Sequence, residues 1–216
     1  MPASTRRAVG ALVAAVGIVL AVVGSWIVVK LGPSGEAQFS AVSKAPGAVV
    51  VTSDVLNSVD VPVRVTATRS DGGAVRLAVA PSVDARALLG TSAASTISAV
   101  HYPAGTADIR STGLGALGDI STADVWRLAA KGSGSAQLVV DQSRAPETAV
   151  ITSGDANALK DVTVTLAWAN RAWFFEALVV ATLGAVIAVF AVSDLWQSRT
   201  IAVRGEVAET TSEVTK

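Results

Sequence analysis

Two long apolar runs constrain the fold of this chain more than any other feature. Residues 8–29 contain no charged side chain, and residues 172–192 contain only one, Glu176. A helix needs roughly 20 apolar residues, at about 1.5 Å each, to cross the hydrocarbon core of a bilayer. We therefore predict two transmembrane helices, one at each end of the chain.

The first apolar run follows a basic N-terminus, which is also typical of a secretory signal peptide. Its 22 residues exceed the roughly 7–15 residues of a signal-peptide core, and no clear small-residue cleavage site ends it. We expect an uncleaved anchor. A cleaved signal peptide stays open, and N-terminal sequencing that began near Gly32 or Gly35 would establish it.

Basic residues flank both runs at the ends that face the chain termini. They are Arg6, Arg7, Arg199 and Arg204. Short basic flanks stay in the cytoplasm, whereas a long loop crosses the membrane largely regardless of its charge. We therefore predict a multi-pass plasma-membrane protein with both termini in the cytoplasm.

This topology divides the chain into five segments. They are a cytoplasmic N-terminus (1–7), a first span (8–29), an extracytoplasmic domain (30–171), a second span (172–192) and a cytoplasmic tail (193–216). The end of the tail is polar, Thr-rich and acidic, so we expect it to be disordered. Tryptophans prefer membrane interfaces, so we expect three of them at the outer interface and one at the inner interface. These are Trp26, Trp168 and Trp173 on the outside, and Trp196 on the inside.

The charges of the central segment exclude one class of partner. Residues 31–171 contain 11 Lys and Arg and 12 Asp and Glu residues, which are interspersed along the chain. Nucleic-acid binding needs a basic patch that neutralises phosphates, so we predict no nucleic-acid partner. The chain has no cysteine, which excludes disulfides. About 140 residues suffice to bury one hydrophobic core without them.

The central segment has the pattern of a β-protein with short strands. Residues 61–69 alternate apolar and polar side chains, and Gly-containing turns at 70–73 and 132–135 are typical of hairpins. The other predicted strands are 48–55, 74–80, 125–131, 136–142, 149–153 and 162–168. We predict an antiparallel β-sandwich with one short helix at 80–90, which Ser82 caps. Residues 101–124 are expected to be a long surface loop with at most one short strand.

Two segments resemble a family of membrane proteins. The matching positions lie in "APSVDARALLG" and "VWRLAAKGSGSAQLVVD" and are Ala80, Pro81, Val83, Asp84, Leu88, Leu89, Trp126, Gly132, Ser133 and Gly134. In these positions the chain is similar to actinobacterial two-pass membrane proteins with an extracytoplasmic β-domain. The resemblance covers about a third of the chain, and Asp141 and Gln142 stand where such proteins often have a Trp. It implies a fold and a location, but no reaction.

Few residues offer a catalytic or metal-binding pattern. His101 is the only histidine, and it lies in a turn-like stretch without a nucleophile elbow. Asp155, Asn157 and Asp161 resemble a calcium loop that lacks its later Glu and its fixed Gly, so we interpret them as turn residues. The glycines of 113–118 lack the Lys-Ser/Thr of a phosphate loop. We therefore predict no catalytic, cofactor-binding or metal-binding residues, and no cofactor. Trp126 is expected to fill the sandwich interior.

The two spans carry small residues four positions apart. Small residues let helix backbones approach closely in lipid, although an Ala-rich composition also produces this spacing. The candidates for helix association are Gly10, Ala14, Gly17, Ala21, Ala177, Ala181, Gly184, Ala185 and Ala188. We expect the spans to pair with each other or with a partner membrane protein, and a homo-oligomer stays open. Lys30, Arg171 and Glu176 are interpreted as interfacial charges, with Lys30 as a possible partner of Glu176.

These features predict a membrane-anchored, non-enzymatic interaction or accessory module of the cell envelope. Its partner would be a membrane protein or a cell-wall polymer. An envelope hydrolase that uses paired carboxylates is one alternative. A small subunit of a membrane transporter or glycosyltransferase complex is another.

Overall fold

The computed structural model describes residues 3–141, 146–154 and 159–213 of the 216-residue chain. The chain divides into two compact units. The first, here the helical unit, comprises Met1–Gly35 and Asn170–Lys216, and the second, here the β-domain, comprises Glu36–Ala169.

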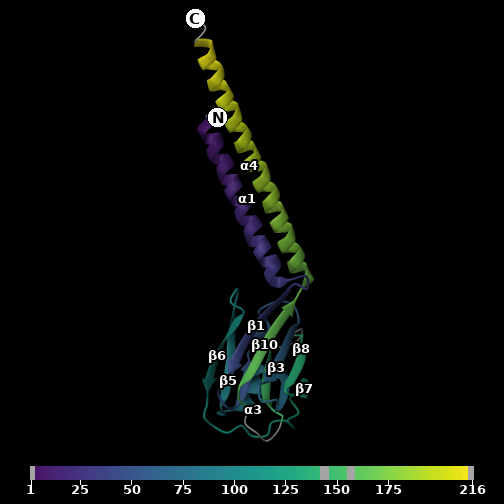
Figure 1. Cartoon of the computed structure of the whole chain (residues 1–216). Coiled ribbons are helices and arrows are strands. Elements are labelled where there is room, and N and C mark those ends of the chain that lie inside the picture. The colour runs from purple at the N-terminus through teal and green to yellow at the C-terminus, as the bar shows by residue number, and fades with distance from the viewer. Residues whose placement is uncertain (1–2, 142–145, 155–158, 214–216) are drawn as a thin grey trace. The chain divides into compact units, whose positions relative to one another are not determined.

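The helical unit is an antiparallel pair of helices, α1 (Ala3–Leu31) and α4 (Arg171–Glu213), that lie side by side (Figure 1). Each contains a 24-residue segment, Ala8–Leu31 or Arg171–Asp194, that is long and apolar enough to cross a membrane. The two predicted apolar helices are thus present. Helix α4 continues beyond its apolar segment to Glu213. Disorder at the end of the tail stays a prediction, and residues 214–216 lie outside the described part.

In the described part of the β-domain, ten strands form one sheet in the order β7-β4-β9-β2-β5-β6-β1-β10-β3-β8 (Figure 1). The strands are β1 (Glu36–Ser43), β2 (Ala48–Val51), β3 (Val63–Arg69), β4 (Ala74–Pro81), β5 (Ala94–His101), β6 (Thr106–Thr112), β7 (Leu128–Ser133), β8 (Ser135–Val140), β9 (Glu147–Ser153) and β10 (Val162–Ala169). Two short helices, α2 (Ser53–Leu56) and α3 (Ser82–Leu89), interrupt them.

Six of the seven predicted strands and the predicted helix 80–90 have counterparts within about three residues of their predicted ends. The seventh, 48–55, is a strand only over Ala48–Val51, because residues 53–55 belong to α2. Ser82 is the first residue of α3, whose N-cap is Pro81, so the prediction that Ser82 caps this helix is wrong. The sequence did not predict β1, β5 or the short helix α2. Strand β6 lies inside the segment 101–124, where the sequence allowed at most one short strand. The inward positions of β1 and β5 include Ser43 and Ser95, which are 4% and 1% exposed and joined by a 2.8 Å hydroxyl hydrogen bond. Serines at buried positions hide the alternation that marks a strand.

The prediction of an antiparallel sandwich is wrong, because the strands form one nearly closed, barrel-like sheet rather than two stacked sheets. Most neighbouring strands are antiparallel, but β2 pairs with β5 in parallel, and β1 meets β6 in parallel at Ser40 and Thr106. These pairings join strands that are distant in sequence. Local turn chemistry therefore could not predict them.

The turns at 70–73 and 132–135 are not hairpin turns of the sheet, which corrects another expectation. Strand β3 pairs with β10 and β8, and β4 pairs with β9 and β7, so each turn joins the two ends of the sheet. The turns bind each other, since Gly134 donates its amide to Gly73 O at 3.0 Å. They therefore close the seam of the barrel.

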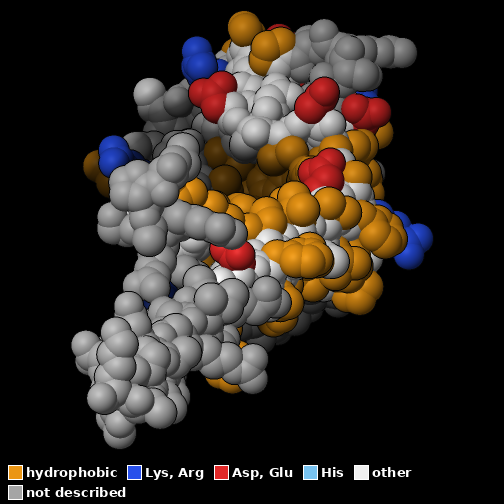
Figure 2. Space-filling view, turned by 90° about the horizontal axis from the view of Figure 1, so that it is seen from above, with side chains coloured by type: hydrophobic (Ala, Val, Ile, Leu, Met, Phe, Trp, Pro, Cys, Tyr) orange, Lys and Arg blue, Asp and Glu red, His pale blue; other side chains and the backbone are white. Residues whose placement is uncertain are grey.

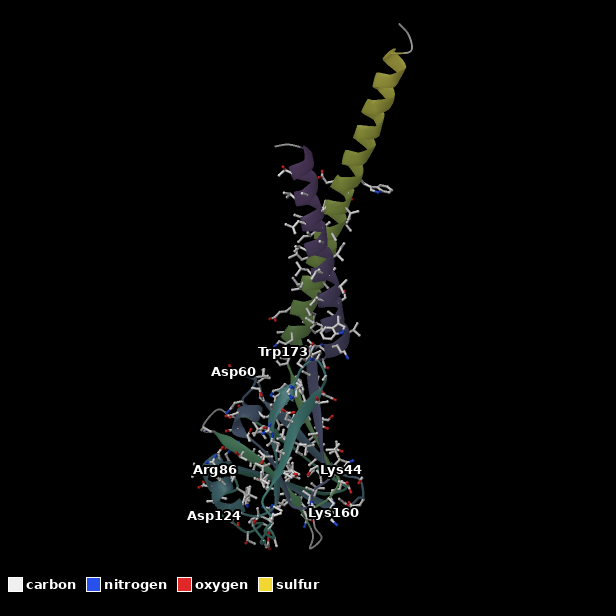
Figure 3. The ribbon with its side chains drawn as sticks, turned by 90° about the vertical axis from the view of Figure 1, so that its left-hand side faces the viewer. Lys44, Asp60, Arg86, Asp124, Lys160 and Trp173 are labelled. Atoms are coloured by element: carbon white, nitrogen blue, oxygen red, sulfur yellow. The ribbon has the colours of Figure 1, made fainter. Side chains whose placement is uncertain are left out.

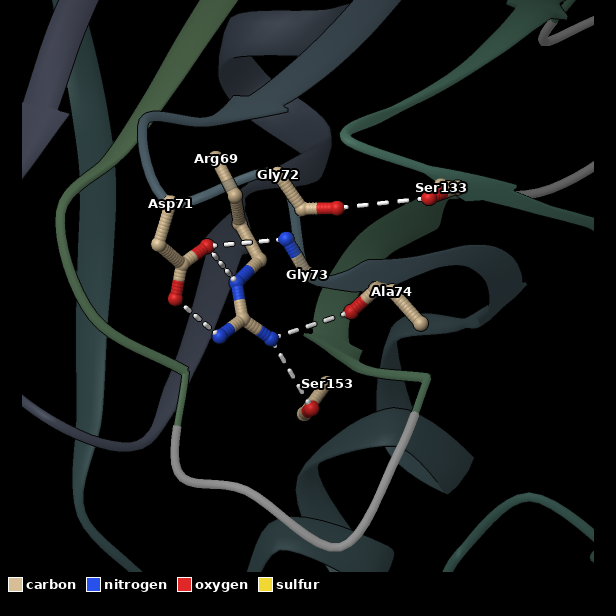
Figure 4. Close-up of polar contacts among 7 residues, drawn as sticks. All are labelled: Arg69, Asp71, Gly72, Gly73, Ala74, Ser133 and Ser153. Atoms are coloured by element: carbon tan, nitrogen blue, oxygen red, sulfur yellow. Dashed lines mark hydrogen bonds and ion pairs between the residues drawn. The ribbon is translucent and has the colours of Figure 1, made fainter.

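Arg69 anchors this seam (Figure 4). Its side chain is 3% exposed and forms a bidentate pair with Asp71, at 2.8 and 2.6 Å. It also donates to Ala74 O at 3.1 Å and to Ser153 Oγ at 3.2 Å. The pair with Arg69 and the amide of Gly73 hold the pKa of Asp71 below its usual value. One buried guanidinium thus binds the β3–β4 turn to the end of β9.

The interior of the β-domain is lined by the alternating side chains of its strands. In β10, Val162, Val164, Leu166 and Trp168 are all at most 1% exposed. Trp168 packs edge to face on Phe39, with the ring centroids 5.6 Å apart. The expectation that Trp168 lies at the membrane interface is therefore wrong, because its strand parity places it in the core.

Trp126 belongs to a smaller apolar cluster instead of the main core. It packs, half-buried, against a cluster that contains Ala80, Ala85 and Val150, and it donates its indole N–H to Ile120 O at 2.8 Å. Val150 pairs with Val50 on β2. Its neighbours along β9, Ala149 and Ile151, point into the barrel, so Val150 points to the outer face of the sheet. The cluster therefore lies on that outer face, under α3. Trp126 therefore does not fill the interior as the sequence predicted.

Candidate functional site

A cleft of about 330 Å³ lies on the outer face of the β-domain, between α2 and α3. Its floor consists of outward side chains of β2, β5, β6 and β9, among them Val50, Thr96 and Thr148. The volume falls at the lower end of the range for small-molecule pockets. The cleft can therefore hold one small molecule.

Thr52 lines the cleft and carries a buried hydroxyl that is closed to solvent. It occupies the N-cap position of α2, where a threonine hydroxyl ordinarily accepts a hydrogen bond from the first turn of the helix. Here its side chain makes no such bond, and its buried Oγ1 has no partner in the described part of the chain. Burying a hydroxyl without a partner costs free energy, so this atom needs an explanation.

Two opposite charges line the same cleft without partners. Asp54 lies in α2 and Arg86 lies in α3, and neither side chain forms a hydrogen bond or ion pair among the described residues. Arg86 lies on the side of the β-domain opposite to Lys44 and Lys160 in the view of Figure 3. Its guanidinium is therefore free to bind an anion.

Two other arginines of the β-domain, Arg127 and Arg69, are engaged in ion pairs, unlike Arg86. Arg127 forms a bidentate pair with Glu147, whose side chain is 5% exposed. The hydrogen bonds to Glu147 raise the pKa of the Arg127 guanidinium above its ordinary value. Arg69 is bound at the barrel seam.

Half of the residues that line the cleft carry hydroxyl groups. Thr148 donates to Ser82 Oγ at 2.8 Å, and Ser82 donates to Pro146 O at 3.0 Å, so these two are held in place. Thr52, Thr96 and Thr112 form no hydrogen bonds through their hydroxyls in the described part of the chain. They can donate to a ligand or accept from it. The arrangement suits recognition of a polar ligand.

The residues that the sequence singled out for chemistry lie away from the cleft. His101 ends β5 and pairs with Asp108 at 3.0 Å, and both side chains are about half exposed. Asp155 and Asn157 lie outside the described residues. Across 3–141, 146–154 and 159–213, no group of three His, Asp or Glu side chains is arranged to hold a metal ion.

Small residues form the contact between α1 and α4. Gly17 lies so close to Ala188 that a Cβ atom added to it would come 2.6 Å from the backbone nitrogen of Ala188. A Cβ added to Gly184 would likewise come 2.4 Å from the nitrogen of Ala21. The structure thus brings together four of the candidate residues. A further contact joins Gly24 to the candidate Ala181. The spacing of small residues in the sequence did not single out Gly24.

The remaining candidates differ in their position on the helix pair. Ala14 and Ala177 are 6% and 7% exposed, whereas Gly10 is half-buried and Ala185 is exposed. Large apolar side chains on both helices point outward. They include Leu12, Val19, Val22, Leu183, Val186 and Phe190. In the view from above, hydrophobic side chains cover much of the described surface (Figure 2).

The three predicted interfacial charges lie on the surface of the helical unit. Lys30, Arg171 and Glu176 are all exposed. No ion pair joins Lys30 to Glu176 among the described residues, so Glu176 is not neutralised by that lysine in this structure.

Comparisons with known proteins show no family for this chain. No protein-family model matches it, and no curated protein matches its sequence. The flagellar cap protein FliD D1-D2-D3 domains from Escherichia coli align with 92% of the chain and 75% of theirs, at 10% identity and a TM-score of 0.24. A Mud Crab Dicistrovirus chain aligns with 66% of this chain and 77% of its own, at 10% identity and a TM-score of 0.23.

A third solved structure is the isomalto-dextranase of Arthrobacter globiformis T6 complexed with panose. It aligns with 61% of this chain and 16% of its own, at 14% identity and a TM-score of 0.15. Similarity at this level carries no argument about function. The function must be inferred from the residues themselves.

The cleft was not predicted from the sequence, although part of it could have been. The helix prediction at 80–90 places Arg86 on a short helix next to the sheet. A lone arginine on such a helix is ordinarily a solvated surface residue, so nothing distinguished it. The unpaired hydroxyl of Thr52 became visible only once the fold had buried it.

Proposed function

We propose that this chain is a two-pass plasma-membrane protein that presents its β-domain outside the cytoplasm as a binding module. The observation that carries the proposal is the arrangement of side chains in the helical unit. Its small residues face the partner helix, and its large apolar side chains face outward. In water such a surface would be costly, whereas lipid solvates it.

The β-domain has the opposite arrangement, which supports a place in water. Its large apolar side chains are buried, and its polar side chains alternate outward along the strands. Connections between the helical unit and the β-domain are short, since α1 ends at Leu31 where β1 begins at Glu36, and only Asn170 separates β10 from α4. The basic residues near both termini support a cytoplasmic position for the termini.

The role as a binding module, without a reaction of its own, is proposed from the cleft. Its described lining offers hydroxyls, one guanidinium and one carboxylate, but no histidine to serve as a general base. Free polar groups that converge on a small pocket are typical of ligand recognition.

Cysteine labelling in intact cells tests the proposed topology, because the chain has no cysteine of its own. Ser133→Cys, in exposed β7, should react with a membrane-impermeant maleimide from outside. The matched variant Thr5→Cys, in exposed α1, should react only after lysis. The reverse pattern would overturn the topology.

Purification in mild detergent tests the role. Co-purification of a second membrane protein in a stoichiometric amount would identify the chain as a subunit of a larger complex. Hydrolysis of a cell-wall glycan by the purified chain would overturn the non-enzymatic role.

A further inference from the structure

We infer that the tip of the β5–β6 hairpin, residues 102–105, docks on the headgroup region of a lipid bilayer, and that Tyr102 is the side chain that enters it. The inference rests on the proposed function, because it requires that α1 and α4 span a membrane. It adds a contact between the β-domain and lipid through a segment that is distant in sequence from both spans.

Tyr102 is the only exposed aromatic side chain in the described part of the β-domain. It is 53% exposed, whereas Phe39 and Trp168 are buried and Trp126 is half-buried. A tyrosine has an apolar ring and a polar hydroxyl, which suits the boundary between water and lipid. Exposed tyrosines also occur on surfaces that face water, so the place of Tyr102 in the domain decides between the two environments.

The hairpin tip lies at the end of the β-domain where β1 begins and β10 ends (Figure 1). Strand β6 runs parallel to β1, and Thr106 lies opposite Ser40. The amide of Ser40 donates to Gly105 O at 3.0 Å. A Cβ atom added to Gly105 would come 3.4 Å from Gln38 O. The turn 102–105 therefore lies beside the first residues of β1, which starts at Glu36.

The same end of the β-domain is joined to the apolar helices by short connections. Asn170 alone links Ala169, the last residue of β10, to Arg171, where the apolar segment of α4 begins. Consecutive Cα atoms are about 3.8 Å apart, so this link spans at most about 8 Å. The headgroup region on each side of a bilayer is about 5–8 Å thick. The end of β10 therefore stays within reach of the headgroups when α4 spans the membrane, and the turn 102–105 lies at that end.

The charge of the turn does not oppose contact with lipid. Residues 102–105 include no charged side chain. On the flanking strands, His101 and Asp108 pair with each other at 3.0 Å. A charged side chain in the turn would favour water, because removing an ion from water is costly. We therefore expect the contact to form with phosphatidylcholine, which has no net charge, and to need no anionic lipid.

Leu114 offers a matched control at the other end of the β-domain. It is 100% exposed and follows the end of β6 at Thr112 by two residues. A strand rises about 3.3 Å per residue, so the length of β6 separates Leu114 from the hairpin tip by about 20 Å. Exposure alone would give Leu114 the stronger tendency to enter lipid, whereas its distance from the spans places it in water.

Spin labels in the full chain, reconstituted in phosphatidylcholine bilayers, test the inference. A label at Ala104→Cys reports on the hairpin tip and leaves Tyr102 in place, and a label at Leu114→Cys reports on the other end. The Ala104 label should collide with a water-soluble nickel chelate at least about threefold less often than the Leu114 label, because the headgroup region limits access of the chelate. It should also collide more often with oxygen, which concentrates in lipid and penetrates packed protein poorly.

Two substitutions locate the contact at Tyr102. In Tyr102→Ser, the Ala104 label should become as accessible to nickel as the Leu114 label, because the aromatic ring is lost. Tyr102→Trp keeps an aromatic side chain that prefers the interface, so the Ala104 label should stay shielded. Neither substitution should change the Leu114 label, which controls for a loss of folding.

Three results would overturn the inference. Equal access of nickel to the Ala104 and Leu114 labels would place the hairpin tip in water. Shielding of the Ala104 label from both nickel and oxygen would mean that protein covers the tip. Unchanged shielding in Tyr102→Ser would mean that Tyr102 does not make the contact.

A label at Val19→Cys separates these results from a failure of the proposed function. When the Val19 label is accessible to oxygen and shielded from nickel, the spans lie in lipid, and any of the three results overturns the hairpin contact alone. Ready access of nickel to the Val19 label would overturn the proposed function and the hairpin contact together.

Discussion

The helical unit and the β-domain place their large apolar side chains in opposite directions. In the helical unit, Gly17, Gly24 and Gly184 form the contact while residues such as Val19 and Val186 face outward. In the β-domain, Leu77, Leu166 and Trp168 are buried. Because apolar side chains turn away from water, the difference supports the proposal that the helical unit lies in lipid and the β-domain in water. The same residue types therefore have different energetic roles in the two units.

The largest expected effect comes from truncating a buried side chain in the β-domain. Leu166→Ala should lower the free energy of unfolding by about 2–5 kcal/mol, because the change removes apolar contacts and leaves a cavity. Denaturant unfolding of the full chain in micelles measures it. Val139→Ala on the exposed face of β8 is the control and should shift stability by less than about 0.5 kcal/mol. Equal losses of unfolding free energy in Leu166→Ala and Val139→Ala would contradict the assignment of Leu166 to the core.

Enlarging a small side chain at the helix contact tests the helical unit. Gly17→Ile should destabilise the α1–α4 contact by about 1–3 kcal/mol, because the new side chain would overlap the backbone of Ala188. Spin labels attached at Leu12→Cys and Ser193→Cys should then show a longer and broader distribution of label-to-label distances in double electron–electron resonance. Ala15→Ile enlarges an outward-facing residue and should leave the distribution unchanged. An unaltered distribution for Gly17→Ile would contradict the close contact.

A comparable effect is expected at the barrel seam. Arg69→Met should cost about 1.5–3 kcal/mol, because it removes the charge-assisted hydrogen bonds of the guanidinium to Asp71 and its bonds to Ala74 O and Ser153 Oγ. Thermal unfolding followed by near-ultraviolet circular dichroism measures the loss. Arg64→Met removes an exposed arginine from β3 and should have little effect. An Arg69→Met variant as stable as the native chain would show that the hydrogen bonds of Arg69 do not stabilise the barrel.

The smallest effect concerns pH. Because Arg69 and Gly73 lower the folded pKa of Asp71, the ionised carboxylate favours the folded state. This contribution is fully present above the unfolded pKa, near 3.8, and is lost as pH falls through the lower folded value. The melting temperature of Asp71→Asn should therefore converge with that of the native chain as the pH falls through the folded pKa, which lies below 3.8. A constant difference from pH 2 to pH 7 would contradict this linkage.

Regular patterns in the sequence predicted part of the fold. The alternation in 61–69 gave β3, and the apolar runs gave α1 and the first part of α4. The alternation in β10 puts Trp168 on the same, buried face as Val164 and Leu166. The sequence analysis assigned Trp168 to the membrane interface instead, because the apolar run 172–192 follows closely. The cleft residues Thr52 and Arg86 come together through the parallel β2–β5 pair and α3. Such long-range pairing leaves no local pattern to recognise.

The central claim is that the outward apolar faces of α1 and α4 lie in lipid. Spin labels at Val19→Cys and Val186→Cys in the reconstituted protein test it directly, through collisions with oxygen, which concentrates in lipid, and with a water-soluble nickel chelate. We expect both labels to be accessible to oxygen and shielded from nickel, whereas a label at Ser133→Cys is accessible to nickel. Ready access of nickel to the helix labels, or shielding of both labels from both reagents, would contradict the account.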